Sequence, residues 1–150
     1  MDKINWINGQ AGGTPLSAEN LNLMQDNIED AIDDSQTLIE GTTLYSNSEG
    51  TAGDITLTDN LSNYSKVEIV YYVSYGDGNV YSTTGKIPVS SRIHLSSLFI
   101  GANSQFNSYC KRLNASGTQI TVGSDRRYIS TGGGTDGTYT YITEIIGYKS

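Results

Sequence analysis

The residue types that most often carry out chemistry are scarce in this chain and are not grouped. It has one cysteine, Cys110, and one histidine, His94, so a cysteine nucleophile would have a single candidate base. No CxxC pair or Cys/His cluster is present to hold zinc. We therefore expect Cys110 to be a small buried strand residue and His94 a strand residue that is on the solvent side or half-buried. The sequence therefore predicts that the protein binds no metal or other cofactor.

Two glycine-rich motifs resemble ligand-binding loops but lack the parts that would complete them. Residues 132–137 match GxGxxG, yet no helix follows to place its N-terminus at a pyrophosphate. Asp77-Gly78-Asn79 has the first spacing of a calcium loop, without the later acids that complete the coordination shell. We interpret the first as a hairpin loop and the second as a turn.

The C-terminal part of the chain contains eight carboxylates, of which glycoside cleavage would need two facing each other across a cleft. Most of them flank glycines or turns, so no pair stands out, and the chain is predicted not to be an enzyme. A small depolymerase remains the alternative. The eight are Glu49, Asp54, Asp59, Glu68, Asp77, Asp125, Asp136 and Glu144.

Eleven tyrosines are the remaining chemical feature, because a tyrosine offers a flat apolar ring and a polar tip to a sugar or protein surface. Tyr71 and Tyr141 are expected in the core. The candidates for a receptor-binding surface are Tyr75, Asp77, Asn79, Tyr81, Tyr109, Arg112, Arg126 and Arg127. The alternative is that each is an ordinary half-exposed strand residue.

These candidates must be positioned by strands, because the pattern after Gly41 alternates β-branched and aromatic runs with Gly, Asn, Asp and Ser. We predict an antiparallel β-sandwich or jelly-roll head over residues 42–150. The expected strands lie near residues 43–45, 54–58, 66–75, 79–86, 92–100, 107–113, 119–122, 126–130 and 138–148.

Two hairpins are predicted within this head. One spans residues 67–86 and turns at residues 76–79, where glycine and asparagine tolerate positive φ, and the other turns at residues 114–117. Residues 67–73 and 139–146 are largely apolar on both faces. Such strands should be central and covered on each side, by the other sheet and by a neighbouring subunit or the helix.

The charge divides the chain near Gly41. Residues 1–40 hold one base, Lys3, against eight acids, and this segment accounts for the net charge of −7. An acidic N-terminal segment on a neutral head argues against nucleic-acid binding, which requires a basic face. The N-terminus also lacks the apolar run of a signal peptide or a membrane helix, so we expect synthesis in the cytoplasm and no membrane insertion.

Residues 17–41 are predicted to form a helix that joins copies of the chain. Ser17 is the expected N-cap and Gly41 the stop. The stripe at helical spacing consists of Leu21, Met24, Ile28, Ala31, Ile32, Ser35 and Leu38. Its width favours a three-stranded coiled coil, or packing on a head domain, over a two-stranded zipper. An amphipathic helix lying on its own β domain is the alternative.

The stretch Ile4-Asn5-Trp6-Ile7-Asn8-Gly9, followed by Gly12-Gly13-Thr14-Pro15-Leu16 and Asn20-Leu21-Asn22, resembles the start of tail and baseplate proteins from phages of Gram-positive and gut bacteria. The match covers about 25 residues. The resemblance implies a homotrimer in the virion, attached to other tail proteins by residues 1–16, whose head contacts a host-surface saccharide. The short stalk without repeats departs from long fibres and leaves a structural baseplate subunit as the alternative.

Overall fold

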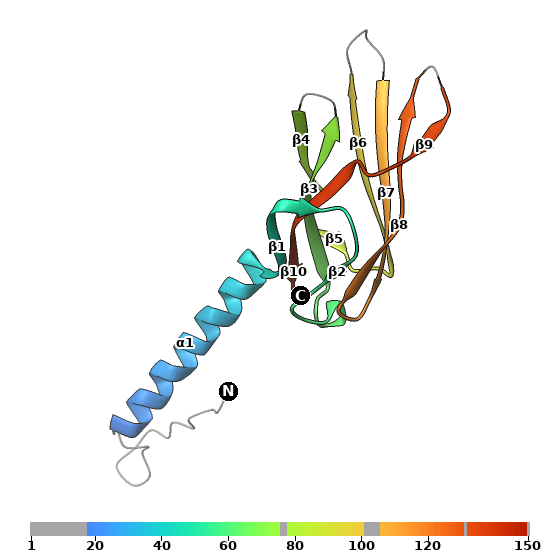
Figure 1. The fold of residues 1–150 in the computed structure, drawn as a ribbon. Coiled ribbons are helices and arrows are strands. Elements are labelled where there is room, and N and C mark those ends of the chain that lie inside the picture. Colours follow the sequence, from blue (N-terminus) through green and yellow to red (C-terminus); the bar gives the residue numbers. More distant parts are fainter. Residues whose placement is uncertain (1–17, 76–77, 101–105, 131, 150) are drawn as a thin grey trace. The chain divides into compact units, whose positions relative to one another are not determined.

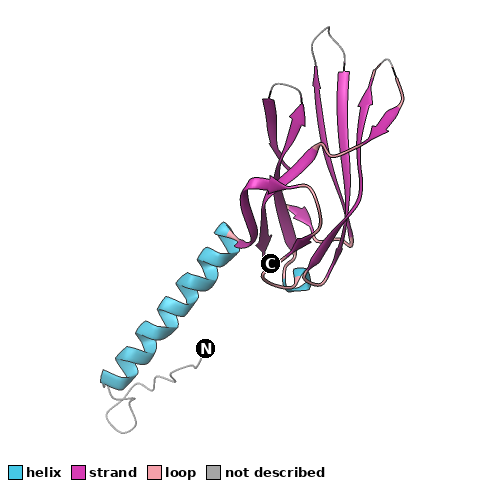
Figure 2. Cartoon of the chain, in the orientation of Figure 1, coloured by secondary structure: helices cyan, strands magenta, loops and turns pink. Residues whose placement is uncertain are grey.

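The computed structural model describes residues 18–75, 78–100, 106–130 and 132–149. The described part is mainly β, with antiparallel sheets and one N-terminal α-helix (Figure 1, Figure 2). This confirms the general fold class that the sequence predicts. The chain divides into two compact units, residues 1–40 and residues 41–150.

The N-terminal unit contains helix α1 (Ala18–Glu40). In the single chain Leu21, Met24, Ile28 and Ile32 are exposed, Ile28 by 57%. The described part of the apolar stripe is therefore exposed on the helix. Ala31 and Ser35 are also exposed, whereas the side chain of Leu38, the expected cap Ser17 and the predicted attachment segment lie outside the described residues. None of the described helices is both long and apolar enough to cross a membrane.

The helix ends where a glycine is required. Gly41 has φ +78°, a backbone conformation that residues with a side chain rarely adopt. A Cβ there would lie 2.6 Å from Cγ2 of Ile146. The chain then enters the head as strand β1, which pairs with the last strand so that Thr42 lies opposite Gly147. The first and last strands of the head are thus neighbours in one sheet.

The head consists of ten strands in the described residues, joined by one 3-10 turn, η1 (Leu61–Asn63). Their bounds are β1 (Thr42–Thr51), β2 (Ile55–Thr56), β3 (Lys66–Tyr75), β4 (Gly78–Thr83), β5 (Ile87–Pro88), β6 (Arg92–Ile100), β7 (Phe106–Ser116), β8 (Gln119–Ile129), β9 (Gly134–Asp136) and β10 (Thr140–Tyr148).

The strands form two five-stranded sheets. Sheet A has the order β1-β10-β3-β4, with β5 also paired to β3, and sheet B has the order β2-β8-β7-β6, with β9 paired to β8. Buried side chains of both sheets, such as Ile69 and Ile142 of sheet A and Leu95 and Leu113 of sheet B, belong to one hydrophobic core. Two sheets that share one core have the layering of a β-sandwich.

Strand β3 is central, as its composition predicts, since it lies between β10 and β4. Val67, Ile69, Tyr71 and Val73 alternate into the core and are buried. The opposite face, including Tyr72, is only partly buried. Within the head this second face is therefore not fully buried, and its cover by a neighbouring subunit or by the helix stays a prediction.

Both predicted strand pairs are present, since β3 pairs with β4 and β7 pairs with β8. The second hairpin turns at residues 117–118 instead of 114–117, because residues 114–116 belong to β7, and residues 76–77 of the first turn lie outside the described residues. Several details of the strand prediction are wrong. Strand β1 extends to Thr51, β4 ends at Thr83, and β5 has no counterpart among the predicted strands. Residues 119–122 and 126–129 belong to one continuous strand, β8, because a register shift opposite Arg112 and Leu113 accommodates the Gly123 region that resembles a turn. The glycine-rich residues 132–137 contain a short strand, β9, that pairs with β8.

Candidate functional site

Three tyrosines form a row across sheet A on the face turned away from the core. Tyr72 of β3 is paired directly with Tyr141 of β10 on one side and with Tyr81 of β4 on the other. Residues opposite each other on neighbouring strands point to the same face of a sheet. We call Tyr141, Tyr72 and Tyr81 the tyrosine row.

The rings of the row contact one another. The centroids of Tyr72 and Tyr141 lie 5.0 Å apart with the rings nearly parallel, and those of Tyr72 and Tyr81 lie 5.5 Å apart with a tilt of 52°. These separations are typical of attractive aromatic pairs. Tyr81 ends the row and is 69% exposed, so it supplies most of the accessible ring surface.

The end of β1 holds the row in place. A Cβ at Gly50, whose φ is +76°, would lie 2.8 Å from Cβ of Tyr141 and 2.8 Å from Cε1 of Tyr72, so the backbone can approach the rings only at a glycine. The Tyr72 hydroxyl donates a 2.8 Å hydrogen bond to the carbonyl of Glu49. Burial raises the pKa of Tyr72, and the nearby Tyr141, Tyr81 and Glu49 raise it further.

An arrangement of this kind can bind a ligand that has both apolar and hydroxyl surfaces. The ring of Tyr81 offers a flat apolar face, and the phenol groups offer hydrogen bonds at its margin. Asn79, exposed on the same strand two residues away, adds an amide on the same face. A sugar ring, with apolar C–H faces and a rim of hydroxyls, matches this combination.

The candidates from the sequence fall into two groups that the fold separates. Tyr81 and Asn79 belong to the row's surface on sheet A, whereas Arg112 and Arg126 lie on β7 and β8 of sheet B. The side chain of Tyr75 and all of Asp77 lie outside the described residues. The predicted surface is therefore not one site.

Tyr109 is a correction to the sequence prediction. It is 1% exposed in the core, with its ring stacked on Phe99 at 5.3 Å, so it cannot contact a receptor at the surface. Tyr109 pairs with Arg127 across β7 and β8, and the half-buried Arg127 donates hydrogen bonds to Oδ1 of the buried Asn107, the closer at 3.1 Å. Arg127 therefore serves the interior of the sheet more than a surface site.

Four other predictions about single residues have mixed outcomes. Tyr71 is a core residue, as expected, and its hydroxyl donates to the carbonyl of Ser96 at 2.7 Å. Tyr141 was expected in the core but is half-buried in the tyrosine row. Cys110 is half-buried on the outer side of sheet B instead of buried, because it alternates with core residues along β7. His94 is exposed on β6, as expected.

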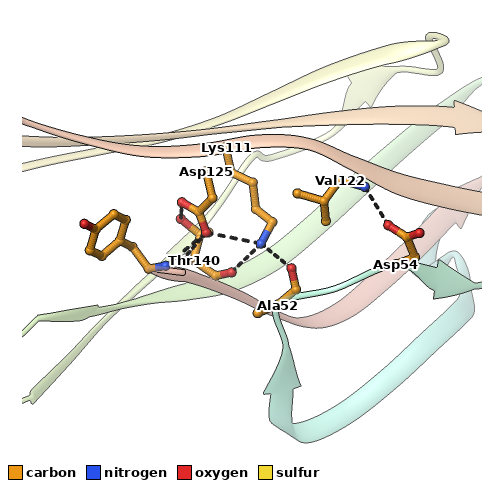
Figure 3. Close-up of polar contacts among 7 residues, drawn as sticks. Ala52, Asp54, Lys111, Val122, Asp125 and Thr140 are labelled. Carbon is orange, nitrogen blue, oxygen red and sulfur yellow. Dashed lines mark hydrogen bonds and ion pairs between the residues drawn. The ribbon is translucent and has the colours of Figure 1, made fainter. Parts of the chain in front are cut away.

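A buried ion pair is the main polar cluster of the head interior (Figure 3). The Nζ of Lys111 lies 3.3 Å from Oδ2 of Asp125 and donates 2.7 Å hydrogen bonds to the carbonyls of Ala52 and Thr140. Asp125 also accepts hydrogen bonds from the backbone amides of Tyr139 and Thr140.

This pair links β7 and β8 of sheet B to the start of β10 and to the segment after β1, so its role is structural. Lys111 is 1% exposed and Asp125 8% exposed, which leaves no access for a substrate. Burial lowers the pKa of Lys111, against the opposing effect of the Asp125 carboxylate. The sequence indicates the buried lysine in one way, because the alternation along β7 places Lys111 on the core side between Tyr109 and Leu113.

The other carboxylates of the described head give no support to glycoside cleavage. Most of them already have a partner: Asp54 accepts from the amide of Val122, Asp136 is paired with Arg126 at 2.7 Å, and Glu68 accepts from the hydroxyls of Thr83 and Tyr148. Among the residues whose placement is described, no group of three or more Asp, Glu, His or Cys side chains is arranged to hold a metal ion.

Comparison with known proteins gives no match, neither to a protein-family model nor to a curated protein.

Proposed function

We propose that the chain is a phage tail receptor-binding protein that binds a host-surface saccharide through the tyrosine row of its head. The observation that carries the proposal is the row itself, which presents Tyr81 at 69% exposure beside Tyr72 and Tyr141. The N-terminal stretch resembling tail and baseplate proteins supports a place in the virion. In this proposal the protein is not an enzyme, and it requires no cofactor.

The proposal includes a homotrimer joined through α1. Leu21, Met24, Ile28 and Ile32 are exposed in the single chain although they are large and apolar, and burying such side chains between copies would stabilise an assembly. The acids Asp26 and Asp33 are exposed on the same helix and are spaced seven residues apart, which keeps both on one side of a coiled coil. The proposal thus specifies a three-stranded coiled coil for α1 and a jelly roll for the head. A jelly roll needs strands from distant parts of the chain to lie side by side, and the neighbouring position of β2 and β8 in sheet B supports this part of the proposal.

Trimer formation would also explain how a shallow site can hold a cell. One exposed ring and a few hydrogen bonds give weak binding, but three linked sites raise the effective concentration at the surface and the overall avidity by orders of magnitude. We therefore expect binding to cells or to immobilised polymer to be much tighter than binding to a soluble oligosaccharide.

The test is binding of the fluorescently labelled full chain to a panel of Gram-positive and gut bacteria, with Tyr81→Ala and Val80→Ala compared on every strain bound by the wild type. Val80 is the matched control because it is the adjacent, exposed apolar residue of β4. We expect Tyr81→Ala to lower the bound fraction at least tenfold and Val80→Ala to change it less than twofold. Equal binding by both variants would show that the tyrosine row takes no part in cell binding. No binding to any strain by the wild type would refute the receptor role.

A structural baseplate subunit is the second candidate. It is favoured by the exposed apolar side chains Leu98, Ile100 and Phe106 on sheet B, which could pack on another virion protein. In that case we expect the chain to join tail assemblies and no strain to bind it.

A further inference from the structure

The outer face of sheet B has a chemistry different from that of the tyrosine row. Along β6 and β7 the inward residues are buried and the alternate residues point outward. His94 of β6 is paired directly with Arg112 of β7, and Arg112 in turn with Ser124 of β8. Arg92 lies two residues from His94 on the same face, and Arg126 lies two residues from Ser124. We call Arg92, His94, Arg112 and Arg126 the basic strip.

The guanidinium of Arg112 lies beside Gly123 of β8. A Cβ added to Gly123 of β8 would lie 2.7 Å from Nε and 3.2 Å from Nη2 of Arg112, so the guanidinium lies over the glycine backbone. Gly123 does not have a positive φ that would require glycine on conformational grounds. The glycine therefore leaves room for the guanidinium of Arg112, which remains exposed.

The strip has more positive than negative charge. Among the outward residues of β6, β7, β8 and β9 the described carboxylate is Asp136, and it is paired with Arg126 at 2.7 Å. Asp54, beside β8, accepts a hydrogen bond from the amide of Val122. The guanidinium groups of Arg92 and Arg112 thus form an anion-attracting surface on a protein whose net charge is −7.

Aromatic rings and hydroxyls continue the same face. The Tyr128 ring lies 5.5 Å from Cζ of Arg126, and Tyr128 is paired with Ser108, which is paired with Leu98. Phe106, at the end of β7, is 54% exposed. Outward side chains of this face lie about 5 Å apart across the strands and about 7 Å apart along them.

We infer that the outer face of sheet B binds an acidic polysaccharide, whose carboxylates contact the basic strip and whose sugar rings pack on Tyr128 and Phe106. A guanidinium binds a carboxylate with two parallel hydrogen bonds, which makes arginine well suited to this contact. A nucleic acid carries a much denser row of charge, about one per 1.7 Å of duplex. An acidic polymer with one charge per sugar matches the two arginines, Arg92 and Arg112, better.

The inference concerns a second surface and rests on the proposed function only in that both ligands are saccharides. The test measures binding of the full chain to polygalacturonate at low salt, with neutral dextran and a single-stranded DNA oligonucleotide as comparison polymers. Three variants are compared: Arg112→Gln removes the central charge, Gly123→Ala displaces it without removing it, and Lys66→Gln removes an exposed charge from sheet A. Thermal unfolding of each variant shows that the head remains folded.

We expect the wild type to bind polygalacturonate with an affinity that falls as salt is raised, and not to bind dextran. Arg112→Gln should weaken binding roughly tenfold, as expected for losing a charge-assisted pair, Gly123→Ala should weaken it severalfold, and Lys66→Gln should change it less than twofold. No binding by the wild type, or equal loss in Arg112→Gln and Lys66→Gln, would overturn the inference. DNA binding as tight as polygalacturonate binding would overturn the saccharide class. Tyr81→Ala should leave polygalacturonate binding unchanged, so failure of this surface and failure of the tyrosine row can be told apart.

Discussion

Replacing Lys111 by methionine tests whether the buried ion pair stabilises the head. The change removes hydrogen bonds from the ammonium to two carbonyls, of Ala52 and Thr140, and to Asp125. It leaves Asp125, 8% exposed, as a buried charge without its cation. Removing one partner of a buried pair costs about 3–5 kcal/mol. Because Asp125 keeps its hydrogen bonds from the amides of Tyr139 and Thr140, we expect a loss near the lower end, about 3 kcal/mol.

The assay is urea unfolding at pH 7, followed by circular dichroism, with the free energy of unfolding obtained by linear extrapolation. Lys66→Met is the matched control, because Lys66 is an exposed lysine of a strand, and we expect it to change stability by less than about 0.5 kcal/mol. The double variant Lys111→Met with Asp125→Asn should recover part of the loss, since it leaves no unpaired charge. A loss below about 1 kcal/mol in Lys111→Met would refute the reasoning, because the penalty for an unpaired buried carboxylate would be missing.

Three further outcomes are expected. The pKa of Asp59 is lowered from its ordinary value of 3.8, chiefly by the hydrogen bond from the Asn60 amide. The ionised carboxylate therefore stabilises the fold at higher pH, and this effect is lost as the pH falls through the lowered pKa of the folded protein. The difference in stability between wild type and Asp59→Asn, from urea midpoints, should close between about pH 5 and pH 2. Gly50→Ala should lower the free energy of unfolding by about 1–3 kcal/mol, since its Cβ would contact the Tyr72 ring at a positive φ, and unchanged stability would contradict the described packing. Ile28→Asp should lower the solution mass found by light scattering, whereas Asn22→Asp, exposed on the same helix, should not; a monomeric wild type would refute the trimer.

Much of the fold is readable from the sequence because its signals are local. The alternation of Val67, Ile69, Tyr71 and Val73 identifies a strand and its buried face, and Gly117, with φ +60°, identifies the β7–β8 turn. The same local reasoning splits β8 at Gly123, because a glycine followed by a serine and an aspartate is typical of a turn. The sequence does not reveal that this glycine makes room for Arg112 on the neighbouring strand.

The candidate site is less readable because it depends on register between distant segments. Tyr72 and Tyr81 belong to one hairpin, but Tyr141 joins them from a strand 60 residues later in the chain, through the β3–β10 pairing. Tyr109 and Tyr81 look alike in sequence, since both lie in alternating strands. One points into the core and the other into solvent, and only the two-sheet packing decides between them.

The pairing of Thr42 with Gly147 places the entrance and exit of the head on adjacent strands, about 5 Å apart. A module with adjoining ends can be spliced into a surface loop of an unrelated protein, since the recipient has to open by little more than one peptide unit. Residues 41–148 could therefore be displayed as an insert on a rigid carrier of chosen valency. Such chimeras would separate the specificity of the head from the number of copies that present it.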